Sequence, residues 1–514
     1  MSSKWGDSGA TTPMNDSQIF EDVENGMKPT YIGDLATNVS PINKDIKSSP
    51  SVATLPQTLS PVFRLDEKNP VPEPAVQTLT PVRPRPKISR WIVFRLWFST
   101  YRKFFTLIVL LNLVGIVLAI VGSFPYAENH LGALVLGNLL FAVLMRNELF
   151  LRFLYLVSIY GLRSWAPLSF KIAVTSTLQH VGGIHSGCAL SGAAWLVYKV
   201  VEIIIHRASQ HGAVLATGII TSILVIASII SAFPWVRNNH HNTFERYHRF
   251  IGWIGLGATW CFTILGNVYD IKRGEWRTDA HSLLSAQELW FAVFMTVFIA
   301  IPWVTLREVP VEVEIPSPKV AILKFERGMQ QGLLGRISRT SVLEYHAFGI
   351  ISAGRKSGCH YMICGVQGDF TKGLVTDPPK TVWTRQLKFA GVGHASAMYN
   401  RGIRICTGTG IGAALSTCIQ SPNWFFIWIG SDQEKTFGPT ITGLIHKHIE
   451  PERMILWDSK KRGGRPDTVQ LLRDVYTSFG AEVIFITSNK QGNDEMMQGC
   501  LATGMNAFGT LWDF

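Results

Sequence analysis

Six long apolar runs, separated by short polar segments, dominate the chain between about residues 104 and 307. We expect membrane-spanning helices at residues 104–122, 131–159, 172–198, 212–232, 248–268 and 289–304. Most of these runs reach the roughly 20 residues that a helix needs to cross the hydrocarbon core of a bilayer. Arg146 and Glu148 interrupt the second run, and we expect them near a membrane surface or paired inside the bundle.

The basic residues indicate how this six-helix bundle is oriented. A basic segment at 83–103 precedes the first run, and Arg237 and Arg249 fall on the same side if every run crosses the membrane. Short loops rich in Lys and Arg stay in the cytosol. We therefore expect a multi-pass protein of the plasma membrane with both termini cytosolic, although Arg207 falls on the outer side.

The composition agrees with this interpretation. Hydrophobic residues make up 47% of the chain, and the formal net charge is +12. Because much of the positive charge lies beside the apolar runs, it predicts contact with a lipid bilayer and not with nucleic acid. We expect residues 1–103 to form a disordered cytosolic tail, because their Pro- and Ser-rich first part has too few large apolar side chains to bury a core.

The pattern changes after the last apolar run, and residues 104–307 are therefore taken as the membrane domain. Alternation at 311–315 predicts a β-strand, and we interpret residues 308–395 as a small β-barrel. In residues 396–514, short apolar runs such as 424–429 alternate with helical stretches. That rhythm is typical of an α/β domain with a parallel sheet.

A glycine-rich turn organises the α/β part of the chain. Gly408, Gly410 and Gly412 lie between an apolar run and a helix-like stretch, and a second pair, Gly391 and Gly393, precedes them. Such a turn lets backbone N–H groups approach a pyrophosphate at a helix N-terminus. A plain strand-to-helix turn has the same letters, so the glycines alone leave both interpretations open.

The order of the motifs resembles that of ferredoxin-reductase-type flavoprotein modules: a flavin barrel, a glycine hinge, a nucleotide turn and a Gly-Arg-Pro-Asp element, here at 464–467. Residues from about 105 to 514 look like the ferric reductase and NADPH oxidase family. Within it, the stretch 242–253 favours the TmpA-like fungal membrane flavoproteins, which are associated with control of asexual sporulation. The resemblance implies FAD and NAD(P)H as cofactors, with Arg465 at the nucleotide.

Two barrel segments carry the resemblance to a flavin site. The segment at 346–352 resembles the family's His-Pro-Phe-Thr/Ser motif, and the segment at 368–371 resembles its Gly-Asp-Trp-Thr motif. The residues that the resemblance assigns to FAD are His346, Phe348, Ile350, Gly368 and Thr371. An ordinary strand histidine is the alternative for His346.

The resemblance also suggests two residues near hydride transfer. Thr487 stands where the family has a cysteine, and Phe514 matches a C-terminal aromatic ring that covers the flavin. A terminal hydrophobic anchor is the alternative for Phe514. NADH and NADPH both stay open, because Lys460 and Lys461 suit either a 2′-phosphate or solvent.

The family holds two haems between pairs of histidines on its third and fifth spans. Here His248 begins the fifth run, and either His180 or His185 on the third run is its partner. Those two lie about 140° apart on a helix, so only one of them faces an iron. The outer position on the fifth run is Cys261 or Phe262, and that on the third run lies near Ala194 or Tyr198. None of these is histidine, so we expect at most one haem b, with hydrogen bonds between helices as the alternative.

Together these features predict a membrane flavoprotein reductase that takes electrons from cytosolic NAD(P)H through FAD to an acceptor that the sequence does not identify. A degenerate reductase that acts as a nucleotide-binding sensor or scaffold is the alternative. The departures from the family pattern at 413–415 and 487–489 favour that second interpretation.

Overall fold

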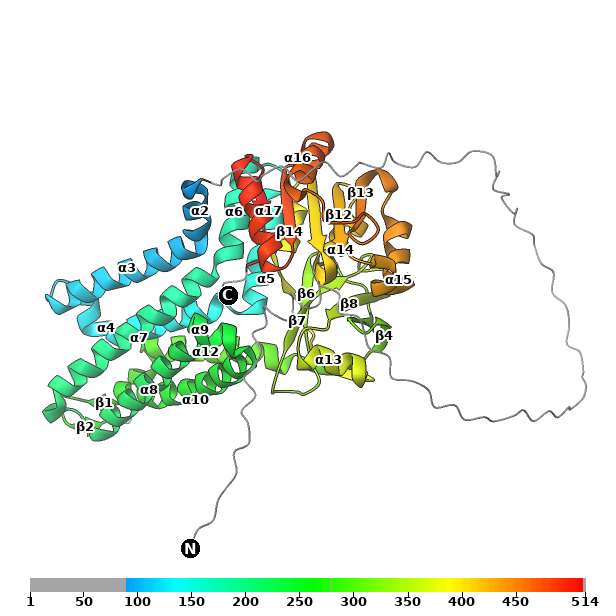
Figure 1. The fold of residues 1–514 in the computed structure, drawn as a ribbon. Coiled ribbons are helices and arrows are strands. Elements are labelled where there is room, and N and C mark those ends of the chain that lie inside the picture. The colour runs from blue at the N-terminus through cyan, green and yellow to red at the C-terminus, as the bar shows by residue number, and fades with distance from the viewer. Residues whose placement is uncertain (1–88, 278, 512–514) are drawn as a thin grey trace, which may run out of the picture. The chain divides into compact units, whose positions relative to one another are not determined.

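The computed structural model describes residues 89–511 apart from residue 278 (Figure 1). Residues 1–88 of the predicted tail lie outside the described residues, as does Phe514. For the rest of that segment the prediction of disorder was wrong, because residues 90–97 and 100–103 are helical. A short helix, α2 (Arg90–Trp97), begins the described part of the chain. It leads directly into the first long apolar helix, α3 (Thr100–Ile120).

Within the described residues, six helices are long and apolar enough to cross a membrane, judged by length and composition alone. They are α3, α4 (Pro125–Leu144), α7 (Gly182–Ile205), α8 (Gly212–Ser231), α10 (His241–Val268) and α12 (Gln287–Val304). Their number matches the expectation. That they span a bilayer stays a prediction.

Two expected spans were wrong in their boundaries. Residues 131–159 form two helices, α4 and α5 (Glu148–Leu162), because Asn147 caps α5 by accepting a 2.9 Å hydrogen bond from the Phe150 N–H. Residues 172–198 are likewise divided between α6 (Leu168–His180) and α7, with Val181 at the junction. At about 1.5 Å per residue, neither α5 nor α6 is long enough to cross a bilayer.

Polar side chains join the helices of the bundle. The Trp195 indole, which is 1% exposed, donates a 2.9 Å hydrogen bond to the Asn112 amide oxygen. Asn138 donates to the same oxygen at 2.9 Å. These bonds connect α3, α4 and α7, because a polar group among apolar helices is stable only when its hydrogen-bond partners come from the neighbouring helices.

An eight-stranded antiparallel sheet follows the last helix of the bundle. Its main strands pair in the order β3-β9-β6-β7-β8-β5-β4. The strands are β3 (Leu306–Pro310), β4 (Glu312–Ser317), β5 (Val320–Glu326), β6 (Leu333–Ser338), β7 (His346–Ile351), β8 (Cys359–Gly365), β9 (Thr381–Arg385) and β10 (Phe389–Ala390). Helix α13 (Asp369–Thr376) follows β8.

A five-stranded parallel sheet completes the chain, as the alternating apolar runs predict. Its order is β13-β12-β11-β14-β15, from β11 (Gly402–Thr407), β12 (Trp424–Gly430), β13 (Met454–Asp458), β14 (Val483–Thr487) and β15 (Ala507–Phe508). The helices are α14 (Ile411–Gln420), α15 (Gln433–His448), α16 (Thr468–Phe479) and α17 (Lys490–Ala502). Residues from α14 and α15 share one apolar core with the antiparallel sheet, and those from α16 and α17 form a second.

The two sheets and their helices are called here the two-sheet module, residues 306–511. Helices α5 and α6 pack against it: Tyr155, Ile159 and Leu178 belong to the core of the antiparallel sheet. The Thr175 and Tyr399 hydroxyls lie 2.8 Å apart, and the Gln179 amide donates to the Gly509 carbonyl at 2.6 Å. The polar break at Asn147 thus redirects an apolar segment from the bundle to this module.

Candidate functional site

The glycine turn lies at the carboxyl end of β11, where the strand order reverses. The chain proceeds from β11 through β12 to β13 on one side, and then crosses to β14 on the other. Ligands of open parallel sheets bind at such a switch point. The short turn η3 (Gly408–Gly410) leads directly into α14, so its backbone N–H groups lie at a helix N-terminus that favours negative charge.

At two positions of this turn, steric constraints explain why the residue is glycine. Gly408 has a φ of +49°, which favours glycine. A Cβ on Gly410 would lie 2.6 Å from the Thr487 carbonyl oxygen, so a larger residue forces the turn away from β14. At Gly412 a Cβ would make only an ordinary 3.5 Å contact with Ile363. The turn is therefore held close to the end of β14.

The segment after β14 serves as packing and as a helix cap. Thr487 lies against the glycine turn, and the Ser488 and Thr407 hydroxyls are 2.8 Å apart. Asn489 caps α17 by accepting a 2.9 Å bond from the Gly492 N–H. The structure thus places Thr487 beside the glycine turn. Phe514, the other residue predicted near hydride transfer, lies outside the described residues.

The Gly-Arg-Pro-Asp element follows β13 at the same edge of the sheet. The Trp457 indole donates to the Gly464 carbonyl at 2.9 Å, and Asp467 caps α16 through a 3.1 Å bond from the Gln470 N–H. Arg465 is exposed in this loop. Lys460, also exposed, forms a 2.6 Å ion pair with Asp432.

The two flavin-like segments come together as the sequence predicts. The His346 ring stacks on Phe370 of the second segment, with ring centroids 4.1 Å apart, and Phe348 lies 6.4 Å from the same ring. Ile350 is buried opposite Met362 of β8. His346 is therefore held among aromatic rings on the face of β7 that it shares with Phe348 and Ile350.

A hydroxyl closes the turn before α13. Thr371 accepts hydrogen bonds from the Gln367 N–H at 3.0 Å and from the Gly368 N–H at 3.2 Å. Gly368 is the N-cap of the helix. The predicted flavin residues Gly368 and Thr371 thus form the N-terminus of α13, directly after strand β8. A helix N-terminus suits a phosphate group.

The other face of β7 is in direct contact with the nucleotide turn. A Cβ on Gly349 would overlap the backbone of Ala413 in α14, and a Cβ on Gly365 of β8 would lie 2.7 Å from the Thr409 methyl carbon. Small residues on the antiparallel sheet thus allow the first turn of α14 to approach. The flavin-like strand and the nucleotide turn form one junction.

The second glycine pair also serves close packing. A Cβ on Gly391 would lie 2.5 Å from a Leu334 methyl, and one on Gly393 would lie 3.3 Å from the Arg404 guanidinium. Arg404 is 2% exposed, donates to the Ala413 carbonyl and lies over the Phe485 ring at 5.6 Å. A buried arginine thus connects β11, α14 and the loop that holds Gly393.

Thiol chemistry is not favoured at this edge. Cys406 lies in β11 beside the glycine turn, but burial raises the pKa of its thiol well above the ordinary value. Burial also raises the pKa of the Cys418 thiol, to about 12. Both groups remain protonated near neutral pH and are poor nucleophiles.

All three predicted haem ligands place Nδ1 against a backbone carbonyl oxygen. The Nδ1 atom of His185 lies 2.8 Å from the Ala142 carbonyl oxygen, and Nδ1 of His248 lies 3.0 Å from that of Ser228. A carbonyl only accepts, so Nδ1 carries the hydrogen in both and Nε2 keeps the lone pair that an iron requires. His180, on α6, likewise places Nδ1 2.7 Å from the Ser176 carbonyl oxygen, so donor chemistry does not choose between His180 and His185.

Other observations limit this fit. Among the described residues, no group of three or more His, Cys, Asp and Glu side chains could hold a metal ion. A Cβ on Gly183 would overlap the Tyr101 backbone, and one on Gly187 would lie 3.0 Å from Ile108. These glycines thus accommodate α3 and not a flat ring. The imidazoles fit a bis-histidine haem in their donor chemistry alone.

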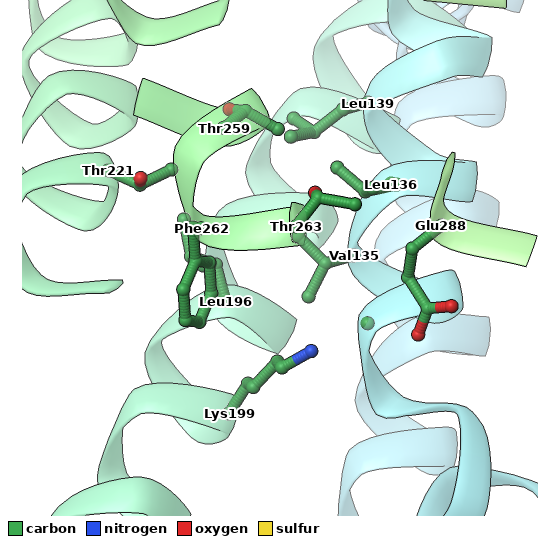
Figure 2. A pocket seen from close by; sticks show the side chains of 11 residues that line it. Val135, Leu136, Leu139, Leu196, Lys199, Thr221, Thr259, Phe262, Thr263 and Glu288 are labelled. Carbon is green, nitrogen blue, oxygen red and sulfur yellow. The ribbon is translucent and has the colours of Figure 1, made fainter. Parts of the chain in front are cut away.

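The sequence analysis missed a pair of charges inside the bundle. Lys199 of α7 and Glu288 of α12 lie beside a small cavity of about 20 Å³ (Figure 2). A Cβ on Gly132 would lie 2.5 Å from the ammonium nitrogen and 2.6 Å from a carboxylate oxygen, so this glycine makes room for both. The cavity is large enough for about one water. In the sequence, the signal for this pair was Lys199, which lies among apolar residues.

This pair occupies the half of the bundle where a second haem was considered. The Lys199 ammonium lies 5.3 Å from the centroid of the Phe262 ring, one of the two expected outer ligand positions on α10. The remaining polar lining consists of Thr221, Thr259 and Thr263. This half of the bundle thus presents an ammonium, a carboxylate and hydroxyls in place of paired imidazoles.

Comparisons with known proteins find relatives that are named adenylate-forming reductases. The family model described as "Adenylate-forming reductase 03009, C-terminal domain" matches residues 392–514. Adenylate-forming reductase 06235 from Coprinopsis cinerea is 28% identical over 423 residues, 81% of this chain and 40% of the relative. Adenylate-forming reductase 03009 from the same organism is 28% identical over 421 residues, with the same coverages. The chain thus spans about 40% of the length of these curated relatives.

Solved structures show weaker likenesses. Phthalate dioxygenase reductase is 8% identical, with a TM-score of 0.32, over 40% of this chain and 68% of that chain. Full-length CYP116B46 from Tepidiphilus thermophilus is 10% identical, with a TM-score of 0.36, over 74% of this chain and 72% of that chain. These likenesses are too slight to support an argument about this chain.

Proposed function

We propose that this chain is a membrane-bound oxidoreductase that takes electrons from cytosolic NAD(P)H through FAD. When bound, FAD accepts a hydride and passes electrons on singly. The observation that carries the proposal is the junction of the nucleotide turn with β7 and β8, where a Cβ on Gly365 would lie 2.7 Å from Thr409. Hydride transfer requires a nicotinamide site and a flavin site to meet in this way.

The chain's own groups have distinct tasks in this proposal. The backbone N–H groups at 408–412 bind the pyrophosphate of the nucleotide, and the N-terminus of α13 binds a flavin phosphate. The exposed cations at 460–465 take the adenosine end of the nucleotide. Nε2 of His185 and Nε2 of His248 would hold one haem b, which supplies a one-electron relay inside the bundle.

The proposed location is the plasma membrane, with the two-sheet module in the cytosol. The six apolar helices and the basic segments beside them support it. The acceptor we propose is membrane-soluble or cytosolic, because Lys199 and Phe262 occupy the outer half of the bundle.

The family assignment belongs to this proposal too. The motifs at 346–352, 368–371 and 464–467 support a TmpA-like, ferric-reductase-related protein with a role in asexual sporulation. The matched relatives are named adenylate-forming reductases. That name combines adenylate formation with reduction, and the junction of β7 with α14 fits reduction.

A second candidate is a nucleotide-binding scaffold without turnover. One observation favours it: the segment 487–489 acts as packing and as a helix cap, where the resembled family has a cysteine. In that case the glycine turn still binds a nucleotide, but no flavin lies beside it.

An absorption spectrum of the full chain, purified in detergent, tests these candidates. We expect flavin bands that bleach when NADPH or NADH is added without oxygen, and one haem or none per flavin. Protein that carries flavin but is not bleached by either nucleotide would contradict the reductase. Colourless protein that still binds NADPH, measured by calorimetry, would instead support the scaffold.

A further inference from the structure

A cluster of arginines surrounds Glu148 where the bundle meets the antiparallel sheet. Glu148 begins α5 directly after the polar break in the second apolar run. The members of the arginine cluster come from the loop before α5, from α10, from β6 and from β9: Arg146, Arg249, Arg336 and Arg385.

Glu148 holds two members of the cluster in fixed positions. One of its carboxylate oxygens accepts a 2.5 Å bond from Arg336 Nε and a 2.9 Å bond from Arg385 Nη1. The Arg385 guanidinium also lies 5.0 Å from the Trp303 ring and 5.0 Å from the Tyr345 ring. Stacked, hydrogen-bonded guanidinium groups keep a defined orientation, unlike solvated lysines.

The cluster carries more positive charge than its carboxylates compensate. Arg249 pairs with Glu245 at 3.3 Å, so four guanidinium groups face two carboxylates, an excess of two positive charges. Two of the cations lie against one ring: the Arg249 and Arg385 guanidinium groups are 5.4 Å and 5.0 Å from the centroid of Trp303. In the described part of the chain, the buried Nε of Arg385 has no hydrogen-bond partner. A half-buried excess of cations is stabilised by a bound anion.

The surroundings of the cluster favour a lipid as the source of that anion. Trp303 lies in the last turn of α12 and packs edge-on against Trp253 of α10, at 5.1 Å. Tryptophans of this kind mark the headgroup level of a membrane protein. The same two helices expose Ile254, at 62%, and Val304, at 66%, which are suitable neighbours for acyl chains.

We propose that the arginine cluster binds the phosphate of an anionic membrane lipid from the leaflet that faces the two-sheet module. The inference rests on the membrane insertion in the proposed function, but not on redox activity. Arg146 is exposed, and the side chain of Arg336 is 32% exposed, so both can reach a headgroup. Glu148 and the aromatic rings hold Arg385 behind them.

The test uses the full chain in detergent and a fluorescent phosphatidic acid as the probe, competed by unlabelled lipids. We expect phosphatidic acid and phosphatidylserine to displace the probe and phosphatidylcholine to fail. The double variant Arg249→Gln/Arg336→Gln should bind the probe at least about tenfold more weakly, because it removes two of the cluster's positive charges. Arg146→Gln, which alters an exposed side chain, should weaken binding without changing the melting temperature.

The matched control is Arg207→Gln/Arg273→Gln, which removes two exposed arginines from segments outside the cluster. Equal weakening in this control would show attraction to overall charge and overturn the site. Displacement by soluble glycerol phosphate as effectively as by the lipid would overturn the lipid as ligand. If alkaline carbonate releases the chain from membranes, both the proposed membrane insertion and the lipid site are refuted. If the chain stays inserted but binds no anionic lipid, the lipid site alone is refuted.

Discussion

Glu148 allows a quantitative test of how the bundle is joined to the two-sheet module. Its side chain is 9% exposed and pairs with Arg336 and Arg385 through one oxygen. Glu148→Ala leaves two guanidinium groups half-buried without their carboxylate. Breaking a buried pair in this way costs about 3–5 kcal/mol, and the partial exposure of Arg336 argues for the lower end, about 3 kcal/mol. The loss of negative charge at the start of α5 adds less than about 1 kcal/mol.

For a module of this size, 1 kcal/mol shifts the melting temperature by roughly 2–4 °C, so about 3 kcal/mol predicts a fall of roughly 6–12 °C. Tryptophan fluorescence of the detergent-purified chain measures it. Glu434→Ala is the matched control, because it removes an exposed acid from the first turn of α15, and it should shift melting by less than about 2 °C. A Glu148→Ala protein that melts with the wild type would refute the view that this pair joins the two parts.

Three further predictions concern single residues. Gly410→Val should weaken NADPH binding at least about tenfold in calorimetry, since its side chain would meet the end of β14, while Gly443→Val, at an open position, should not. If the purified chain carries haem, His248→Ala should abolish the Soret band and His180→Ala should leave it, and the reverse would exchange the ligands. Burial lowers the pKa of Lys388 from 10.5 to about 8, a desolvation cost of about 3.4 kcal/mol at pH 7. Lys388→Met removes this cost together with the hydrogen bonds to Thr384 and Arg385, each worth about 1 kcal/mol, so it should stabilise the protein by about 1–2 kcal/mol. Because the unfolded chain binds more protons between those two values, wild-type stability should rise over that range and the variant's advantage should vanish above it, as urea melts at several pH values would show.

The parallel sheet was predictable because its strands are apolar on both faces. The segment 424–429 is buried throughout, and such a run between helical stretches has few other interpretations. The approach of the two flavin-like segments was also predictable, since their letters and spacing match a known family. His346 and Phe370 do meet, at 4.1 Å.

The helix boundaries were less predictable. A polar interruption in an apolar segment can lie within one helix, or it can end that helix and begin another. Arg146 and Glu148 were expected to interrupt a single span, whereas the Asn147 side chain between them caps a new helix and also donates to the Phe298 carbonyl at 2.7 Å. Contacts between distant segments leave even less signal. Gly132 makes room for Lys199 and Glu288 across three helices, and no local pattern reports such a pairing. The role of Gly349 likewise depends on α14, which lies in another part of the chain.

The last prediction concerns how far electrons travel in the bundle. Rapid transfer across roughly 30 Å of hydrocarbon requires relays in series. In the half that holds His185 and His248, two imidazoles keep Nε2 available for an iron. In the other half, the corresponding space holds the Lys199 ammonium over the Phe262 ring, and the cavity beside them has room for about one water.

A second haem therefore does not fit there, and electrons should remain in the half that faces the two-sheet module. We expect cells that express this chain to reduce impermeant extracellular ferric chelates no faster than cells without it. Membranes from the same cells should oxidise NADPH when a membrane-soluble quinone is supplied. Lys199→His/Phe262→His places imidazoles at the two facing positions, and a gain of extracellular reduction in that variant would support the argument. Robust reduction of the outside chelate by the unmodified chain would refute it, because electrons would then cross the outer half without the relay that the argument requires.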